Sequence, residues 1–301
     1  MLGATTSVAE RRRAFREGLA SGRLLRFPGA FNPNSALLIE EHGFEGVYVS
    51  GAVLSAELGL PDIGLTTLTE VAGRAHAIAR VTNLPALVDA DTGFGEPMNA
   101  ARTVQQLEEM GLAGCHIEDQ VNPKRCGHLD GKAVVGRDEM CRRLAAAVGA
   151  RRDGDFVVCA RTDARAVEGL DGAIERAKAY VDAGADLIFA EALENEHEFE
   201  QFKKAVPAPL LANMTEFGKS PLLSRATLEA LGVNVAIYPV TFFRLAMGAA
   251  EAGLEVLARE GDQRSLVDKM QTRARLYEVL DYEGYTAFDG EIFNFTLEDN
   301  S

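Results

Sequence analysis

The sequence is poor in basic residues and in cysteine. It has 31 Lys and Arg residues against 45 Asp and Glu residues, for a formal net charge of -14. Nucleic acid or an anionic membrane would call for a basic patch, so the sequence predicts neither as a partner. The four cysteines form no Cys-X-X-Cys or Cys/His pattern of zinc type. Reduced thiols are therefore their simplest state.

Long apolar runs are also absent. No window approaches about 18 uninterrupted apolar residues, and the basic run at residues 11–13 is followed by no apolar segment of a secretory signal. The sequence therefore predicts a soluble, cytoplasmic protein. Hydrophobic residues make up 47% of the 301 residues, which is ample for the core of one large domain.

Short apolar runs alternate with amphipathic stretches along most of the chain. Strands are expected at residues 24–27, 46–50, 86–89, 114–118, 156–160, 186–190, 209–212 and 233–238. Helices are expected at residues 34–42, 67–82, 99–110, 137–150, 171–183, 196–205, 224–231 and 242–259, after a first helix capped by Ser7. Strands this apolar predict a parallel (β/α)8 barrel of TIM type. An open doubly wound sheet is the alternative, but residues 28–31 are not its glycine-rich phosphate turn.

The end of the chain is not required by a barrel. We expect one domain, 1–301, in which residues 265–301 form a C-terminal helical extension. A further helix is expected from Leu266 to Leu280, followed by a tail rich in Tyr and Phe. Exposed aromatic residues in such a tail favour packing against another subunit, so the sequence predicts a homo-oligomer.

Polar residues occur where the expected strands end, which is where the catalytic groups of such barrels lie. They are Tyr48, Ser50, Asp89, Asp91, Glu118, Arg161, Glu191, Asn213 and Thr215, with Arg244 after the last strand. Each alone could be a helix cap or a surface ion pair. Their coincidence at seven strand ends favours a binding site. The forked and neutral donors among them suit carboxylates, which indicates a small polycarboxylate ligand.

The carboxylates of this set predict a metal. Asp89 and Asp91 lie two residues apart, on one side of an extended segment, and Glu118 and Glu191 follow other strands. Few ligands, all of them oxygen, favour Mg²⁺. The alternative is that two of these carboxylates pair with Arg161 and with Arg74 or Arg102.

A basic segment follows the fourth strand, in a loop of residues 120–135. Its residues are Lys124, Arg125, Cys126, Gly127 and His128. Basic neighbours favour the thiolate of Cys126 and make it a candidate nucleophile or proton donor. A solvated basic turn with an incidental cysteine is the other interpretation.

With residues 116–120 (His-Ile-Glu-Asp-Gln), this segment resembles the active-site signature of the isocitrate lyase and phosphoenolpyruvate mutase superfamily, in the form found in its 2-methylisocitrate lyases. The likeness runs from residue 27 to residue 295. It implies a (β/α)8 barrel whose terminal helices are exchanged between subunits, usually in a tetramer. The reaction it implies is Mg²⁺-dependent cleavage of 2-methylisocitrate to pyruvate and succinate, in the methylcitrate cycle of propionate breakdown.

The resemblance also implies roles for residues. Asp89 and Asp91 would hold Mg²⁺, and Cys126 would be the general acid. The base is open between Tyr48, which we prefer, Asp62 and a metal-bound water. The implied substrate-binding residues are Ser50, Gly51, Ala52, Cys126, Gly127, Arg161, Glu191, Asn213, Met214, Thr215, Arg244 and Arg273. The supporting residues are Asp62, Glu118, Lys124, Arg125 and His128.

Two departures from the pattern leave the substrate open. Ala190 stands where these lyases often have Pro, and residues 129–132 (Leu-Asp-Gly-Lys) look more like the wider superfamily. A 2,3-dimethylmalate lyase and an oxaloacetate-acting enzyme are therefore alternatives, and a non-catalytic metabolite-binding barrel is the alternative of another class. Phe189 and Ile237 would supply apolar contact to a 2-methyl group, which favours 2-methylisocitrate.

Overall fold

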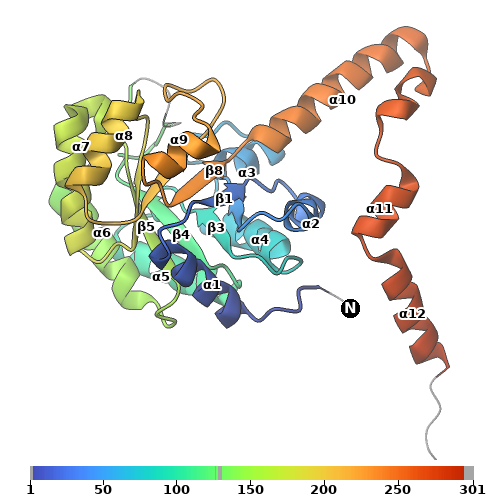
Figure 1. The fold of residues 1–301 in the computed structure, drawn as a ribbon, viewed down its shortest axis with the longest axis horizontal. Helices are drawn as coiled ribbons and strands as arrows, with labels where there is room; N and C mark the ends of the chain where they lie inside the picture. The colour runs from blue at the N-terminus through green and yellow to red at the C-terminus, as the bar shows by residue number, and fades with distance from the viewer. Residues whose placement is uncertain (1–2, 126, 128–130, 295–301) are drawn as a thin grey trace, which may run out of the picture.

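The computed structural model describes residues 3–125, 127 and 131–294 (Figure 1). Its eight parallel strands form one sheet in the order β1-β8-β7-β6-β5-β4-β3-β2. They are β1 (Leu25–Pro28), β2 (Val47–Val49), β3 (Ala86–Asp89), β4 (Gly114–Glu118), β5 (Val157–Thr162), β6 (Leu187–Ala190), β7 (Leu210–Asn213) and β8 (Val235–Tyr238). A parallel bridge between Gly29 and Tyr48 brings the ends of the sheet together. This nearly closed sheet confirms the predicted barrel.

Helices lie between the strands and cover the outside of the sheet (Figure 1). They are α1 (Val8–Ala20), α2 (Pro33–Glu41), α3 (Gly51–Glu57), α4 (Leu68–Ala79), α5 (Pro97–Glu109), α6 (Arg137–Ala150), α7 (Arg165–Asp182), α8 (Glu196–Ala205) and α9 (Arg225–Ala230). Ser7 caps α1 in a reciprocal capping box with Glu10, as predicted. The short helix α3 was not predicted. The stretch that includes α7 begins earlier than predicted, across a kink where Gly169 has a φ of 81°.

Side chains alternate between the inside and the outside of the barrel, because the side-chain period of a strand is two. The inner layer includes Phe27, Leu87, Cys159, Leu187 and Phe189, while residues such as Val88 and Val158 pack against the helices outside. Continuing the inner rows one step towards the carboxyl ends reaches polar residues. Leu87 is followed by Asp89, Cys159 by Arg161, and Phe189 by Glu191. The pleat therefore places these groups at one mouth.

The last part of the chain leaves the barrel as an arm. It comprises α10 (Thr241–Glu260), the 3₁₀ helix η1 (Arg264–Lys269), α11 (Arg273–Val279) and α12 (Tyr282–Phe293) (Figure 1). The residues of α10 are helical as predicted, but none of them is buried. The single helix expected from Leu266 to Leu280 is wrong, because the chain breaks between η1 and α11. The aromatic tail is itself helical, as α12.

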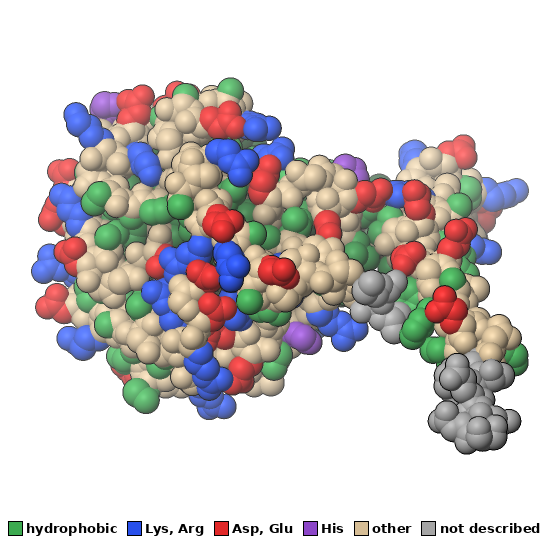
Figure 2. All heavy atoms as spheres, turned by 60° about the horizontal axis from the view of Figure 1, so that its bottom comes forward, with side chains coloured by type: hydrophobic (Ala, Val, Ile, Leu, Met, Phe, Trp, Pro, Cys, Tyr) green, Lys and Arg blue, Asp and Glu red, His purple; other side chains and the backbone are tan. Residues whose placement is uncertain are grey.

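The arm exposes many large apolar side chains. Those of Leu245, Leu254, Tyr282, Phe288 and Phe293 are between 47% and 88% exposed. In Figure 2 the arm projects to one side of the barrel, with apolar side chains among its charged ones. Arg275 of α11 pairs with Glu41 of α2, so the arm also contacts the barrel. No helix in the described part of the chain is long and apolar enough to cross a membrane.

Candidate active site

A cavity of about 80 Å³ lies at the carboxyl ends of the strands. Most of the predicted site residues line it, from seven of the eight strands or the loops after them. The lining residues are Tyr48, Ser50, Ala52, Asp62, Asp89, Lys124, Gly127, Arg161, Phe189, Glu191, Asn213, Thr215, Pro239, Val240 and Arg244. The barrel thus brings together residues that the sequence separates by nearly 200 positions.

Asp89 and Asp91 form a buried acidic pair beside Lys124. The Asp91 backbone N–H donates to Asp89 Oδ1 (3.0 Å), and the Gly51 N–H donates to Asp89 Oδ2 (3.3 Å). The Lys124 ammonium lies 2.9 Å from Asp91 Oδ1 and also contacts Asp62. Burial raises the pKa of Asp91 to about 6, against the opposing charge of Lys124. Burial would also lower the pKa of Lys124, but the surrounding carboxylates raise it above its usual value, so this ammonium stays charged.

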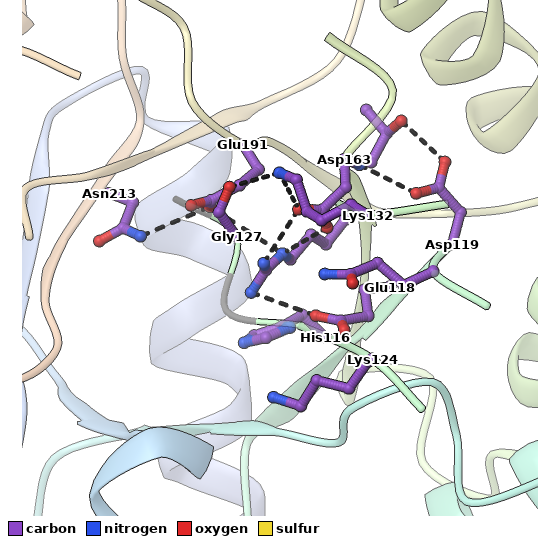
Figure 3. Close-up of polar contacts among 12 residues, drawn as sticks. His116, Glu118, Asp119, Lys124, Gly127, Lys132, Asp163, Glu191 and Asn213 are labelled. Carbon is purple, nitrogen blue, oxygen red and sulfur yellow. Dashed lines mark hydrogen bonds and ion pairs between the residues drawn. The ribbon is translucent and has the colours of Figure 1, made fainter. Parts of the chain in front are cut away.

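Arg161 is the centre of a second cluster (Figure 3). Its Nε donates to Asp163 Oδ2 (3.0 Å) and its Nη2 to Asp163 Oδ1 (3.2 Å). Its Nη1 lies 3.2 Å from Glu118 Oε2, and Glu191 Oε2 lies 3.9 Å from its Nε. The guanidinium also stands over the Phe189 ring, 5.1 Å from the centroid. These contacts fix the guanidinium plane at the floor of the cavity.

Gly127 approaches this cluster closely. A Cβ on Gly127 would lie 2.3 Å from Arg161 Nη2 and 2.5 Å from Glu191 Oε1. Only a glycine fits there without displacing charged groups. The Gly127 carbonyl oxygen accepts a hydrogen bond from Lys132 Nζ, which also lies 2.9 Å from Asp163 Oδ1.

Tyr48 meets His116 in the interior of the barrel. Its hydroxyl lies 2.7 Å from His116 Nε2, and the same nitrogen is 3.6 Å from Asp89 Oδ1. Burial lowers the pKa of His116 to about 4, so the ring is neutral near pH 7. Burial, and then the Asp89 carboxylate, raise the pKa of Tyr48 well above its usual value. The phenol is therefore protonated, which disfavours Tyr48 as a base in the free site.

Several predicted residues lie elsewhere. Met214 is buried in the outer core, and Arg125 is exposed and joined to Gln120 through its backbone. Arg273 is exposed at the start of α11, outside the cavity lining. Cys126 and His128 lie outside the described residues. Ile237 belongs to the inner apolar layer beneath the cavity, so of the two apolar residues predicted, only Phe189 lines it.

Three residues of the site were not predicted: His116, Asp163 and Lys132. His116 stands two residues before Glu118, so the same strand period that points Glu118 inward could have identified it. Asp163 shows the same i, i+2 relation to Arg161. Lys132 carried no comparable signal, because its contacts depend on how the loop folds back.

The carboxylates do not all converge on one point. Among the described residues, no group of three or more His, Cys, Asp or Glu side chains is placed to hold a metal ion. Glu118 and Glu191 pair with Arg161, which is the alternative considered for two of the four carboxylates. Arg74 instead pairs with Glu57. Asp89 and Asp91 remain as an acidic pair at the carboxyl end of β3.

A family profile described as phosphoenolpyruvate phosphomutase matches residues 15–258. The chain belongs to this family. Curated relatives carry the name that the signature segment suggested. A protein of Corynebacterium glutamicum named probable 2-methylisocitrate lyase 2 is 62% identical over 298 residues. The match covers 99% of this chain and 97% of the relative. The 2-methylisocitrate lyase of Escherichia coli is 49% identical over 275 residues, covering 91% and 93%. The predicted resemblance is confirmed.

Solved structures of the superfamily share the fold over nearly the whole chain. An oxaloacetate acetylhydrolase bound to 3,3-difluorooxalacetate has a TM-score of 0.89 and 35% identity, covering 97% of this chain and 99% of its own. A 2,3-dimethylmalate lyase has a TM-score of 0.88 and 33% identity, covering 99% and 98%. A phosphonopyruvate hydrolase in complex with oxalate and Mg²⁺ has a TM-score of 0.86 and 32% identity, covering 94% and 99%.

Proposed function

We propose that this enzyme is a carbon-carbon lyase that cleaves 2-methylisocitrate to pyruvate and succinate with the help of Mg²⁺, in propionate breakdown. The observation that carries the proposal is the cavity itself. Asp89, which accepts a hydrogen bond from the Asp91 N–H, lines it together with the Arg161 guanidinium, the amide of Asn213 and the hydroxyl of Thr215. Relatives named 2-methylisocitrate lyase, at 46–63% identity, support the choice of substrate.

The residues present fit a magnesium ion held by two carboxylates. Mg²⁺ keeps several waters and binds through one or two protein carboxylates together with its substrate. Asp89 and Asp91 would be these ligands, and Mg²⁺ bound in a relative with oxalate supports the assignment. When bound, the ion supplies Lewis acidity to the substrate hydroxyl and carboxylate.

Side chains of the protein would bind the substrate and transfer the protons. Arg161 and Arg244 would bind substrate carboxylates, and Asn213 and Thr215 would donate to them. The bond that breaks joins C2, which carries the hydroxyl and methyl groups, to C3. Its electron pair leaves on the succinate half, and Cys126 would protonate that carbon as the general acid.

Two residues of the cavity are candidates for accepting the hydroxyl proton. Tyr48 is protonated in the free site and must first lose its own proton, whereas Asp62 lies in the same cavity and pairs with the Lys124 ammonium. This favours Asp62. Replacing Asp62 with Asn should therefore lower kcat more than Tyr48→Phe does, and the reverse order would return the role to Tyr48.

The other predicted residues would have supporting roles. Ser50, Gly51 and Ala52 would contact substrate at the start of α3, while Gly127 and Glu191 would shape the wall beside Arg161. Lys124, Arg125 and His128 would set the local charge around Cys126.

We also propose a cytoplasmic homotetramer. The chain would form one domain, with residues 265–301 as an extension packed on a second copy. The exposed apolar side chains of the arm support this arrangement, because water is a poor partner for so many of them. A second copy would also bring Arg273 near a barrel mouth. A monomeric mass in light scattering would contradict the oligomer.

The test is release of the oxo-acid product, each reaction assayed with Mg²⁺ and with EDTA. The product is pyruvate from 2-methylisocitrate and 2,3-dimethylmalate, glyoxylate from isocitrate, and oxalate or pyruvate from oxaloacetate. We expect turnover only with Mg²⁺, a preference for 2-methylisocitrate, and collapse in Cys126→Ser. A preference for 2,3-dimethylmalate, or oxaloacetate cleavage alone, would assign the enzyme to a sister activity. Inertness towards all four acids, with binding retained, would favour a non-catalytic metabolite-binding barrel.

A further inference from the structure

Lys132 is a buried lysine that the proposed chemistry does not use. It lies in the same loop as the signature segment, two residues before Val134, which forms a short bridge with Gln120. Its side chain is only 2% exposed, yet it is absent from the cavity lining. Burying an ammonium is costly unless it is paired and hydrogen-bonded. The contacts of Lys132 therefore indicate what it is for.

Those contacts join two parts of the site (Figure 3). Lys132 Nζ donates to the Gly127 carbonyl oxygen on one side and to Asp163 Oδ1, at 2.9 Å, on the other. Asp163 in turn accepts two hydrogen bonds from Arg161. A single ammonium thus links the segment that carries Cys126 to the guanidinium expected to bind substrate.

The Asp163 side of this link is rigid. The Asp163 backbone N–H donates to Asp119 Oδ1 (2.9 Å), and Asp119 is fully buried. The Thr162 hydroxyl (2.8 Å) and the Tyr180 hydroxyl (2.7 Å) both donate to Asp119 Oδ2. The barrel therefore fixes the position of Asp163, and Lys132 joins Gly127 to it.

The Gly127 side needs such a tie. The backbone of Gly127 already lies against Arg161 and Glu191, as the clash of an added Cβ shows. Without the ammonium, the carbonyl of Gly127 would lose this partner and Asp163 would keep only Arg161 as its cation. Both changes loosen the wall of the cavity that adjoins Cys126 in the chain.

We propose that Lys132 is a positioning residue, which ties the Gly127 carbonyl to Asp163 and so fixes Gly127, the residue next to Cys126 in the chain, against Arg161. The proposal rests on the proposed function for its catalytic consequence. Lys132 acts through Gly127 and Asp163 rather than on substrate, so its loss should lower kcat more than it changes KM.

The first test compares Lys132→Met with Lys178→Met. Lys178 pairs with Glu175 at 2.7 Å on the surface and serves as the matched control. Hydrogen bonds that involve a charged group imply a loss of about 10- to 100-fold in kcat for Lys132→Met. The control should stay within about twofold of wild type, as for other exposed pairs.

The second test does not depend on the substrate. Iodoacetamide alkylation, followed site by site through peptide mass mapping, reports on Cys126, with the half-buried Cys141 as internal reference. Lys132→Met should raise the Cys126 rate about tenfold, as expected when a charge-assisted hydrogen bond is lost, and leave the Cys141 rate unchanged. Circular dichroism checks that each variant is folded. If Lys132→Met does not fold, Lys132→Gln takes its place, because Gln keeps a hydrogen-bond donor for Gly127 without the charge.

An unchanged Cys126 rate overturns the proposal whether or not turnover falls, because Lys132 would then not position the segment. A changed rate, with kcat lowered and KM nearly constant, supports it. If wild type turns over none of the acids, the proposed function fails, while the alkylation comparison still decides the role of Lys132.

Discussion

Adding one methyl group at Gly127 tests the geometry of the site directly. In Gly127→Ala the new Cβ would lie 2.3 Å from Arg161 Nη2, where ordinary contacts begin at 3.4 Å. One of the two must therefore move by about 1 Å, and a misplacement of that size can cost about 100-fold in rate. Arg161 cannot yield easily, because Asp163, Glu118 and Glu191 hold it.

The assay is pyruvate release from 2-methylisocitrate together with thermal unfolding. We expect kcat/KM to fall about 100-fold, and overpacking to cost about 1–3 kcal/mol of stability. Gly136→Ala is the matched control, because an added Cβ there meets nothing within 4 Å and its φ is -55°. A Gly127→Ala enzyme within about threefold of wild type would refute the close approach of Gly127 to Arg161, since a 1 Å displacement predicts far more.

Three further substitutions probe the metal pair, acid stability and the buried network. Gly51→Ala places a Cβ 2.8 Å from Asp89 Oδ2. It should weaken activation by Mg²⁺ at least about tenfold in a magnesium titration, because metal ligands depend on the groups that orient them. Gly149→Ala, which has open space around it, should leave the activation unchanged. The hydrogen bond from Arg176 holds the pKa of Glu168 below its ordinary value of 4.5. The pair therefore stabilises the folded state above pH 4.5, and this stabilisation is lost as the pH falls through the lowered pKa. In urea unfolding, Glu168→Gln should therefore cost up to about 1 kcal/mol at neutral pH and less in acid, and an equal cost at both would contradict the sign. Tyr180→Phe removes a 2.7 Å hydrogen bond to Asp119 and should cost about 1–3 kcal/mol in the same assay, and a neutral result would remove Tyr180 from the network.

The strand period explains why much of the site could be predicted from the sequence. All eight strands lie where the apolar runs predicted them, and polar residues at their ends face one mouth because the barrel is parallel. The pairing of carboxylates with Arg161 was considered only as an alternative, and its partners Glu118 and Glu191 were not identified, since the pairing depends on side-chain positions across neighbouring strands. The short helix α3 follows β2 after the single residue Ser50, and its seven residues are too few for a helical pattern to predict it.

The sequence did not show which surface covers the apolar face of α10. Its amphipathic pattern predicted a helix correctly, but such a pattern says only that one face is to be covered, not by which chain. The barrel of the same chain leaves that face exposed, and a second copy is the partner we propose for it.

The charges of the site give a reason for the proposed metal that does not depend on the relatives. Seven carboxyl groups, those of Asp62, Asp89, Asp91, Glu118, Asp163, Glu191 and Glu216, accompany four cations, Lys124, Lys132, Arg161 and Arg244. Burial raises the pKa of Glu118 well above its usual value, which leaves six carboxylates against these four cations. The cations are already engaged by carboxylates, so a polycarboxylate entering this field would meet excess negative charge. Unpaired charges of one sign are costly in a buried site. The proposed divalent cation beside Asp89 and Asp91 would remove that excess where the substrate would bind. The same balance would explain why acidic residues hold Arg161 in the free site.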